Sequence, residues 1–231
     1  MKKTIIYLII LFCHNISNCQ SVNKDTILER TNPKFLNLNE HQIFIDTTRN
    51  SKFYLEIKNW KKSKYDYQNI EEYLKSLNNN FEVKSIDLKK FPKKFIRVRK
   101  LNGEFVLYNR CDGIDFRFEL LKNQFIIYGI WESEVHTISK IIELKKDYLK
   151  LELNSINSRT RFQKSYLEIK RKESLIFELN FENESRNLSL LITTIDKINE
   201  FELVVNHCPK MKMPEFENFD GMKKKELIKI E

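Results

Sequence analysis

Glycine, proline, cysteine and histidine are all scarce in this chain, with four of each among its 231 residues. The glycines are not gathered into a phosphate-binding loop, and the sequence has neither a serine elbow nor the paired-histidine helix motif of metalloproteases. These absences leave no catalytic signature and no motif that would hold a cofactor. We therefore expect a protein that is not an enzyme and carries no cofactor.

Long hydrophobic runs are missing as well. An apolar stretch over residues 5–12 follows Lys2 and Lys3 and precedes a polar run that ends at Cys19. This layout is typical of a secretory signal peptide, and its apolar part is far shorter than the roughly 20 residues of a membrane-spanning helix. We predict that residues 1–19 direct export to the periplasm, the outer membrane or the medium, and that the mature chain has no transmembrane helix.

Two kinds of processing are compatible with the end of this signal peptide. Residues 16–19 (Ile-Ser-Asn-Cys) resemble a bacterial lipobox, which implies acylation of Cys19 and a lipoprotein, although Asn18 departs from the small residue usual there. The alternative is simple cleavage after Cys19, which leaves Gln20 as the first residue.

Basic residues exceed acidic ones, 41 against 32, which gives a net charge of +9. Loss of Lys2 and Lys3 with the signal peptide lowers the charge to +7. The lysines are scattered among acidic residues and cluster only at 89–90, 93–94 and 223–225, whereas nucleic-acid binding needs basic residues on one face. We expect no nucleic-acid partner; the excess charge suits either a loose attraction to anionic lipids or a merely soluble surface.

Alternation of apolar and polar residues dominates residues 94–207. Phe116, Phe118 and Leu120, for example, alternate with charged residues, which is the period of a half-buried strand. The connections are too short for helical crossovers, so neighbouring strands should pair antiparallel. We predict a mainly β fold in which residues 91–208 form a meander, curved or closed into a barrel. Its ten strands are expected near 94–99, 104–110, 115–121, 124–130, 135–145, 148–154, 162–171, 174–182, 187–196 and 199–207.

Two cysteines remain after the predicted processing, Cys111 and Cys208. Exported chains fold where thiols are oxidised, so we expect a disulfide between them, while free thiols or pairing between chains are the alternatives. Each cysteine follows an even-numbered strand of the meander, and those strands all run in one direction. The two thiols would meet if the tenth strand returned beside the first to close the barrel.

The flanks of the meander are less regular. In the N-terminal lead-in, residues 20–90, Ile70, Tyr73, Leu74 and Leu77 share one helical face, which predicts a short helix at 69–78. We expect this helix to cover a mouth or an edge of the sheet, and strands are plausible at 42–46, 52–58 and 81–88. The C-terminal segment, residues 209–231, has no period and is interpreted as a strap or a loose tail.

A group of soft ligands lies near the end of the last strand. His207, Cys208, Met211 and Met213 combine the ligand types that suit Cu(I), but they meet no spacing rule, and a disulfide would consume Cys208. His207 and Cys208 cannot form a nucleophile and base pair either, because neighbours on a strand point to opposite faces. We expect a surface histidine beside a structural cysteine, and no metal site.

Acidic residues offer two further candidates. Asp112, Asp115 and Glu119 lie close together in sequence, but Asp112 precedes a glycine in a turn and the calcium-loop pattern is absent. Glu132 and Glu134, beside Trp131 and His136, are interpreted as an exposed loop and the start of a strand. Neither group is expected to be catalytic.

Taken together, a signal peptide, a lead-in, an antiparallel meander and a disulfide from late to early sequence resemble the lipocalin-like group of exported β-barrels. The resemblance spans residues 90–208 and is architectural: Trp60 and Trp131 lack the Gly-x-Trp motif, and no site residue is carried over. It implies a barrel whose interior binds an apolar small molecule or lipid. The alternative is a structural or interaction module of the envelope with a filled core, because both faces of the strands at 124–130 and 187–196 are apolar and require a cover, such as the N-terminal segment or another envelope protein.

Overall fold

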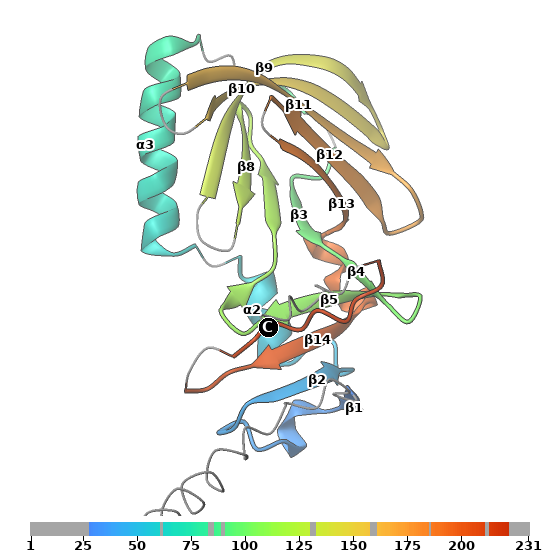
Figure 1. Cartoon of the computed structure of the whole chain (residues 1–231). Coiled ribbons are helices and arrows are strands. Elements are labelled where there is room, and N and C mark those ends of the chain that lie inside the picture. Colours follow the sequence, from blue (N-terminus) through green and yellow to red (C-terminus); the bar gives the residue numbers. More distant parts are fainter. Residues whose placement is uncertain are drawn as a thin grey trace, which may run out of the picture.

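The structure is a computed structural model that describes residues 28–60, 62–82, 86–88, 91–129, 133–157, 161–184, 186–210 and 213–221. The predicted signal peptide and Cys19 lie outside the described residues, so export and acylation stay predictions. The described chain contains a closed barrel, a smaller open sheet below it, and a long helix beside the barrel (Figure 1).

Eight antiparallel strands form the barrel, in the ring order β3-β7-β8-β9-β10-β11-β12-β13. From β7 to β13 the strands follow one another in sequence, as a meander should. Pairing of β13 with β3 closes the ring, with Ile192 opposite Arg97. The strands are β3 (Lys94–Arg97), β7 (Arg117–Leu120), β8 (Gln124–Tyr128), β9 (Ser133–Lys145), β10 (Tyr148–Asn157), β11 (Arg161–Arg171), β12 (Phe177–Asn183) and β13 (Arg186–Thr194).

The second sheet is assembled from distant parts of the chain. Its order is β1-β2-β14-β5-β4, with β6 beside β5. In its centre β14 is parallel to β5, with Val204 opposite Tyr108, and antiparallel to β2, with Val204 opposite Ile45. The strands are β1 (Glu29–Thr31), β2 (Gln42–Asp46), β4 (Arg99–Leu101), β5 (Glu104–Arg110), β6 (Gly113–Ile114) and β14 (Glu202–His207).

A mainly β fold with a closed barrel is thus confirmed, but the single ten-strand meander is wrong. The segments predicted as strands at 104–110 and 199–207 leave the barrel and pair with each other as β5 and β14. The chain departs from the barrel after β3 and returns at β7, and the 3-10 helix η2 (Ile195–Glu200) leads it from β13 to the second sheet. Alternation defines the two faces of a strand, but it does not determine which strand lies beside it.

The lead-in contains two helices where one was predicted. The helix α3 (Lys64–Asn80) extends the predicted 69–78 at both ends, and it begins with a capping box. The Ser63 hydroxyl accepts a 3.1 Å bond from the Asp66 N–H, and the Asp66 carboxylate accepts a 2.7 Å bond from the Ser63 N–H. Among the described residues, no helix is long and apolar enough to span a bilayer.

The strand prediction for the lead-in is confirmed at 42–46, which is β2, and wrong at 52–58, which is the helix α2 (Lys52–Lys58). In α2 the buried side chains are Phe53, Tyr54 and Ile57, which lie on one helical face rather than on alternate positions of a strand. The described residues of 81–88 form no strand, and a 3-10 turn, η1 (Pro33–Phe35), precedes β2.

The helix α3 lies along the outer wall of the barrel rather than over a mouth (Figure 1). Ile70, Tyr73 and Leu74 of this helix pack against Ile126 and Val135, which point outward from β8 and β9. The apolar outer face of β8 is therefore covered within the chain.

The outer face of β13 is covered by the second sheet where Leu191 lies, whereas the polar Asn187 and Ser189 on the same face are exposed. Leu191 packs in a cluster that contains Val98, Leu203 and Val205, together with Phe53 of α2. Both strands that are apolar on two faces thus find their cover inside the molecule, so these faces supply no open docking strip.

Inward-facing side chains fill the barrel lumen. Phe125 of β8 and Phe181 of β12 come from opposite sides of the ring of strands, yet their ring centroids lie only 6.3 Å apart. Phe95 of β3 and Phe177 of β12, whose strands are separated only by β13, make a second aromatic contact inside the lumen at 5.6 Å. The buried cluster comprises Leu88, Phe91, Phe95, Phe118, Leu120, Phe125, Ile127, Ile138, Leu149, Leu151, Leu153, Leu167, Ile169, Phe177, Leu179, Phe181, Leu190 and Ile192.

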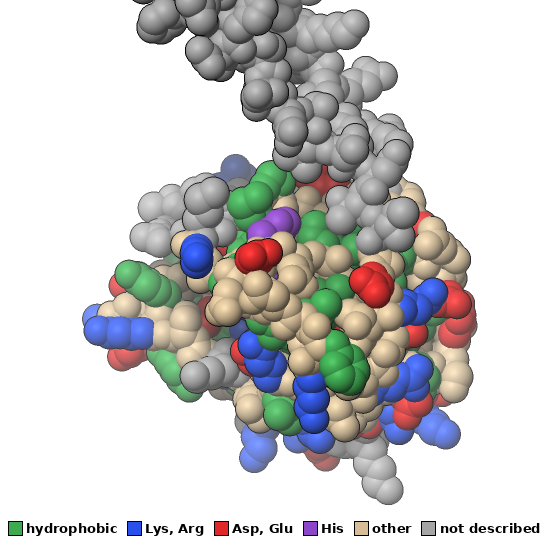
Figure 2. Space-filling view, turned by 90° about the horizontal axis from the view of Figure 1, so that it is seen from below, with side chains coloured by type: hydrophobic (Ala, Val, Ile, Leu, Met, Phe, Trp, Pro, Cys, Tyr) green, Lys and Arg blue, Asp and Glu red, His purple; other side chains and the backbone are tan. Residues whose placement is uncertain are grey.

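The face of the molecule seen in Figure 2 carries basic and acidic side chains interspersed around its periphery, with apolar side chains scattered between them. Many of the charges on the described surface are paired. Arg30, for example, lies 2.9 Å from both Glu104 and Glu202. The described residues of this face therefore form no single-sign patch of the kind that binds polyanions.

Candidate functional site

Cys111 and Cys208 form the predicted disulfide, with their Cα atoms 5.2 Å apart. Cys111 follows β5 and Cys208 follows β14, and the parallel pairing of these strands brings both residues to the same end of the second sheet. The expected disulfide is present, but the strand arrangement that was expected to bring the two cysteines together is wrong. The last strand lies beside β5 and β2, and not beside β3 of the barrel.

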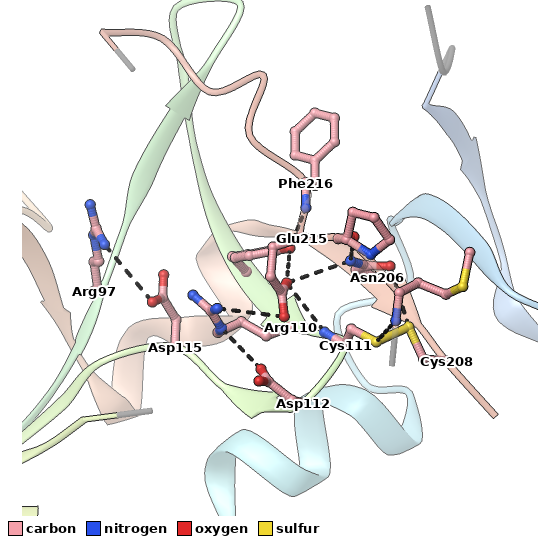
Figure 3. A network of polar contacts seen from close by, with 12 residues as sticks. Arg97, Arg110, Cys111, Asp112, Asp115, Asn206, Cys208, Glu215 and Phe216 are labelled. Carbon is pink, nitrogen blue, oxygen red and sulfur yellow. Dashed lines mark hydrogen bonds and ion pairs between the residues drawn. A yellow bond between two sulfur atoms is a disulfide. The ribbon is translucent and has the colours of Figure 1, made fainter. Parts of the chain in front are cut away.

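Glu215 lies at the centre of a polar network around the disulfide (Figure 3). Its carboxylate accepts a 2.5 Å hydrogen bond from the Tyr108 hydroxyl and a 3.4 Å bond from the Cys111 N–H, and it lies 3.5 Å from Arg110. Burial and the bond to Glu215 raise the pKa of Tyr108. These contacts fix residues 213–221 as a strap over β5, which is a structural role.

The soft-ligand group does not assemble into a metal site. Cys208 is consumed by the disulfide, and His207 Nε2 lies 2.8 Å from the carbonyl oxygen of Leu38. Met211 lies outside the described residues, and the backbone N–H of Met213 donates a 3.1 Å hydrogen bond to Cys111 Sγ. In the part of the chain that the structure describes, no three His, Cys, Asp or Glu side chains are placed to hold a metal ion.

The three carboxylates near the first turn are dispersed. Asp112 pairs with Arg110 at 3.3 Å, whereas Asp115 is fully buried and pairs with Arg99 at 2.7 Å. Glu119 points outward from β7 toward α3. Three separate environments exclude a shared acid and base pair for these residues.

Glu119 belongs to an ion network on the outer wall. Burial raises its pKa, but hydrogen bonds from Tyr128, at 2.7 Å, and Lys62, at 2.9 Å, outweigh that effect, so the pKa of Glu119 is lowered. The network joins the start of α3 to the barrel. It is another structural contact.

A polar layer inside the lumen was not foreseen. His136 of β9, predicted to be exposed, is buried in the lumen, where its Nδ1 lies 2.7 Å from the Ser155 hydroxyl of β10. Ser155 in turn lies 2.6 Å from the Ser165 hydroxyl of β11. The three side chains share the inward rows with Ile138, Leu153 and Leu167. The sequence contains one signal of this layer. On each strand the polar residue continues the two-residue spacing of the inward apolar residues.

This layer does not have the properties of a hydrolytic site. Burial and the nearby Arg186 lower the pKa of His136 to about 3, so the imidazole is a weak base at neutral pH. Glu134 lies 3.9 Å from His136 Nε2 and is held by Arg186, so it does not orient the ring by a direct hydrogen bond. The contact between Ser155 and His136 is therefore a buried polar network rather than an activated nucleophile.

A pocket of about 410 Å³ opens where β7 turns into β8. Its two walls are the segment before β3 and the β7–β8 turn, which are joined by 2.7 Å bonds from the Ile86 N–H to the Lys122 carbonyl and from the Leu120 N–H to the Lys93 carbonyl. Its floor contains Leu88 and Leu120 of the lumen cluster. The lining residues are Ile86, Asp87, Leu88, Lys93, Leu120, Leu121 and Lys122.

Comparison with known proteins finds no family model that matches this sequence, no similar curated protein and no similar solved structure. The candidate sites therefore rest on the geometry and chemistry of this chain alone.

Proposed function

We propose that this protein is an exported, non-enzymatic binding protein that holds an amphiphile, apolar in its body and anionic at its head, at one mouth of the barrel. The observation that supports the proposal is the pocket beside the β7–β8 turn. Its volume of about 410 Å³ falls in the range of ligand sites, roughly 300–1,000 Å³.

The lining divides into two chemical zones. Leu88, Leu120 and Ile86 offer apolar surface, and Leu88 and Leu120 continue into the lumen cluster. Lys93 and Lys122 are exposed and line the same pocket. An apolar chain on the leucines would place a carboxylate or phosphate within reach of the lysines, where charge-assisted hydrogen bonds are favoured.

The mouth is a better place for the ligand than the lumen. The lumen is occupied by side chains that touch across it, as Phe125 and Phe181 do at 6.3 Å. A ligand there would have to displace close-packed residues, which costs their dispersion contacts. At the mouth, binding requires only desolvation of surfaces that already line a pocket.

Binding can be tested with a fluorescent fatty acid and the disulfide-bonded protein. We expect saturable binding to the wild type and roughly tenfold weaker binding to the double variant Lys93→Glu, Lys122→Glu, because both head-group contacts become repulsive. The matched control is Lys140→Glu, Lys170→Glu, which changes the net charge equally at exposed positions on β9 and β11. Absence of saturable binding, or equal loss in the two double variants, would overturn the proposal.

A second candidate is a structural or interaction module of the envelope, and the filled lumen favours it. This candidate predicts no probe binding to the wild type. It also predicts that chemical cross-linking in intact envelopes captures a stoichiometric partner. Capture of no such partner would count against it, since the apolar faces of β8 and β13 are already covered within the chain.

A further inference from the structure

The polar layer of the lumen is closed on one side by an ion pair that crosses the barrel. Arg186 of β13 and Glu134 of β9 come from strands at opposite positions of the eight-strand ring. Two bonds join them, at 2.8 and 3.0 Å, and both side chains are about a third exposed, at 36% and 37%. This clasp therefore lies at the rim, where β12 turns into β13.

The ring of Phe181, a member of the apolar cluster, lies against both the clasp and the polar layer. The guanidinium of Arg186 lies 5.3 Å from the centre of this ring, and the His136 ring lies 4.8 Å from it. His136, Ser155 and Ser165 are connected in one hydrogen-bonded row around the wall. The layer is thus bounded by the Glu134–Arg186 ion pair on the solvent side and lies against the Phe181 ring.

Three buried polar atoms in and beside this layer have no protein partner among the described residues. They are His136 Nε2, Gln163 Oε1 and Arg186 Nε. Gln163 lies opposite Ser155 in the pairing of β10 with β11, which places it in the same layer. His136 and Gln163 are both more than nine-tenths buried. Buried polar atoms in folded proteins are nearly always hydrogen-bonded, so these atoms point to a bound molecule.

The chemistry of the three atoms defines that molecule. The amide oxygen of Gln163 accepts a hydrogen bond, whereas the Nε–H of Arg186 donates one. The 3.9 Å separation of His136 Nε2 and Glu134 Oε2 is too long for a direct hydrogen bond, so His136 Nε2 needs another partner. A charged ligand would face both Glu134 and Arg186, whose charges already neutralise each other.

We infer that the layer of His136, Ser155 and Gln163 is a closed site for a small neutral molecule that donates and accepts hydrogen bonds, either water or a short alcohol. The clasp of Glu134 and Arg186 controls the exchange of this molecule with solvent. The site is independent of the mouth pocket, because successive turns of an antiparallel barrel alternate between its ends and the two sites lie beside turns of opposite ends.

Magnetic relaxation dispersion of water in the wild-type protein tests the inference without any substitution. We expect a long-lived internal water signal that is lost in Gln163→Leu. A parallel nuclear magnetic resonance titration with ethylene glycol distinguishes the two ligands, because shifts at Ser155 and Ser165 would assign the site to an alcohol. Absence of both signals in the wild type, or a water signal that persists unchanged in Gln163→Leu and His136→Phe, would overturn the inference.

The role of the clasp has its own measurement. Glu134→Gln weakens the clasp of Glu134 and Arg186, so we expect roughly tenfold faster exchange of the bound molecule than in the wild type. The matched control is Glu184→Gln, which weakens an exposed ion pair with Arg161 at 3.2 Å. Equal exchange rates in the two variants would contradict the assignment of Glu134 and Arg186 as the closure.

Discussion

The barrel and the second sheet are built from the same kind of strand, but they are assembled differently. In the barrel, β7 to β13 follow one another through short connections, so most pairings are local in sequence. In the second sheet, β14 is paired with β5 and β2, which lie far away in the chain. Local pairings require less loop-closure entropy than distant ones.

This difference explains where the disulfide lies. The disulfide Cys111–Cys208 joins residues 97 positions apart and fastens the two distant central strands of the second sheet. The barrel has no need of such a bond, because its lumen of large apolar side chains is continuous around a closed ring. The disulfide thus offsets the loop-closure entropy of the pairing between β5 and β14, which are distant in sequence.

The largest expected effect concerns the ion pairs of Asp115, which connect the barrel to the second sheet. Asp115 is fully buried and pairs with Arg99 of β4 at 2.7 Å and with Arg97 of β3 at 3.9 Å. In Asp115→Ala the arginines lose this carboxylate, so the free energy of unfolding should fall by about 3–5 kcal/mol in urea titrations. The half-exposed pair of Asp147 with Arg171 is the control, and Asp147→Ala should change stability by less than about 1 kcal/mol. Equal effects of both substitutions would show that the buried ion pairs of Asp115 contribute little to stability.

Loss of the disulfide should destabilise the second sheet more than the barrel. In Cys111→Ala, Cys208→Ala the free energy of unfolding is expected to fall by about 2–4 kcal/mol, because the unfolded chain regains the entropy of a long loop. Amide hydrogen exchange should accelerate in β2, β5 and β14, whereas β9 to β12 keep their protection. Uniform acceleration in both regions would contradict the view of the barrel as the more independent unit.

Acid should weaken the barrel through His136. Its folded pKa of about 3 lies below the unfolded value of 6.5, so the unfolded chain binds the extra proton as the pH falls between these values. The wild type should therefore lose about 1.4 kcal/mol of stability per pH unit from this residue below pH 6.5, and His136→Phe should not. Urea titrations at several pH values measure the slope, and the exposed His41→Asn is the control. Parallel stability curves for wild type and His136→Phe would disprove burial of a neutral imidazole.

The smallest effect concerns the helix that covers the barrel. Removal of the capping hydroxyl in Ser63→Ala should reduce stability by about 1 kcal/mol, because the Asp66 N–H loses its acceptor. Ser189→Ala, at an exposed position of β13, should change stability by less than about 0.5 kcal/mol. Thermal unfolding compares the two variants; equal melting temperatures would show that α3 contributes little to the barrel.

The candidate sites were less predictable than the strands. Glu134 and His136 were interpreted as an exposed loop and the start of a strand, whereas Glu134 is about a third exposed, at 37%, and His136 is buried. Only the ring of strands places them opposite Arg186 and beside Ser155. Likewise, the pocket between Lys93 and Lys122 depends on where the segment before β3 rests against the β7–β8 turn, and no sequence pattern reports that contact.

What the sequence determined by itself is the set of strands with two chemically different faces, from Phe95 to Val205, and the two cysteines available for one bond. The tertiary structure alone decided which strands close the ring, that β5 and β14 pair in parallel outside it, and which polar residues meet in the lumen. The physical reason is that periodicity is a local property of a chain. Which strands pair in a sheet depends on the free energies of all the competing strand pairings in the whole chain.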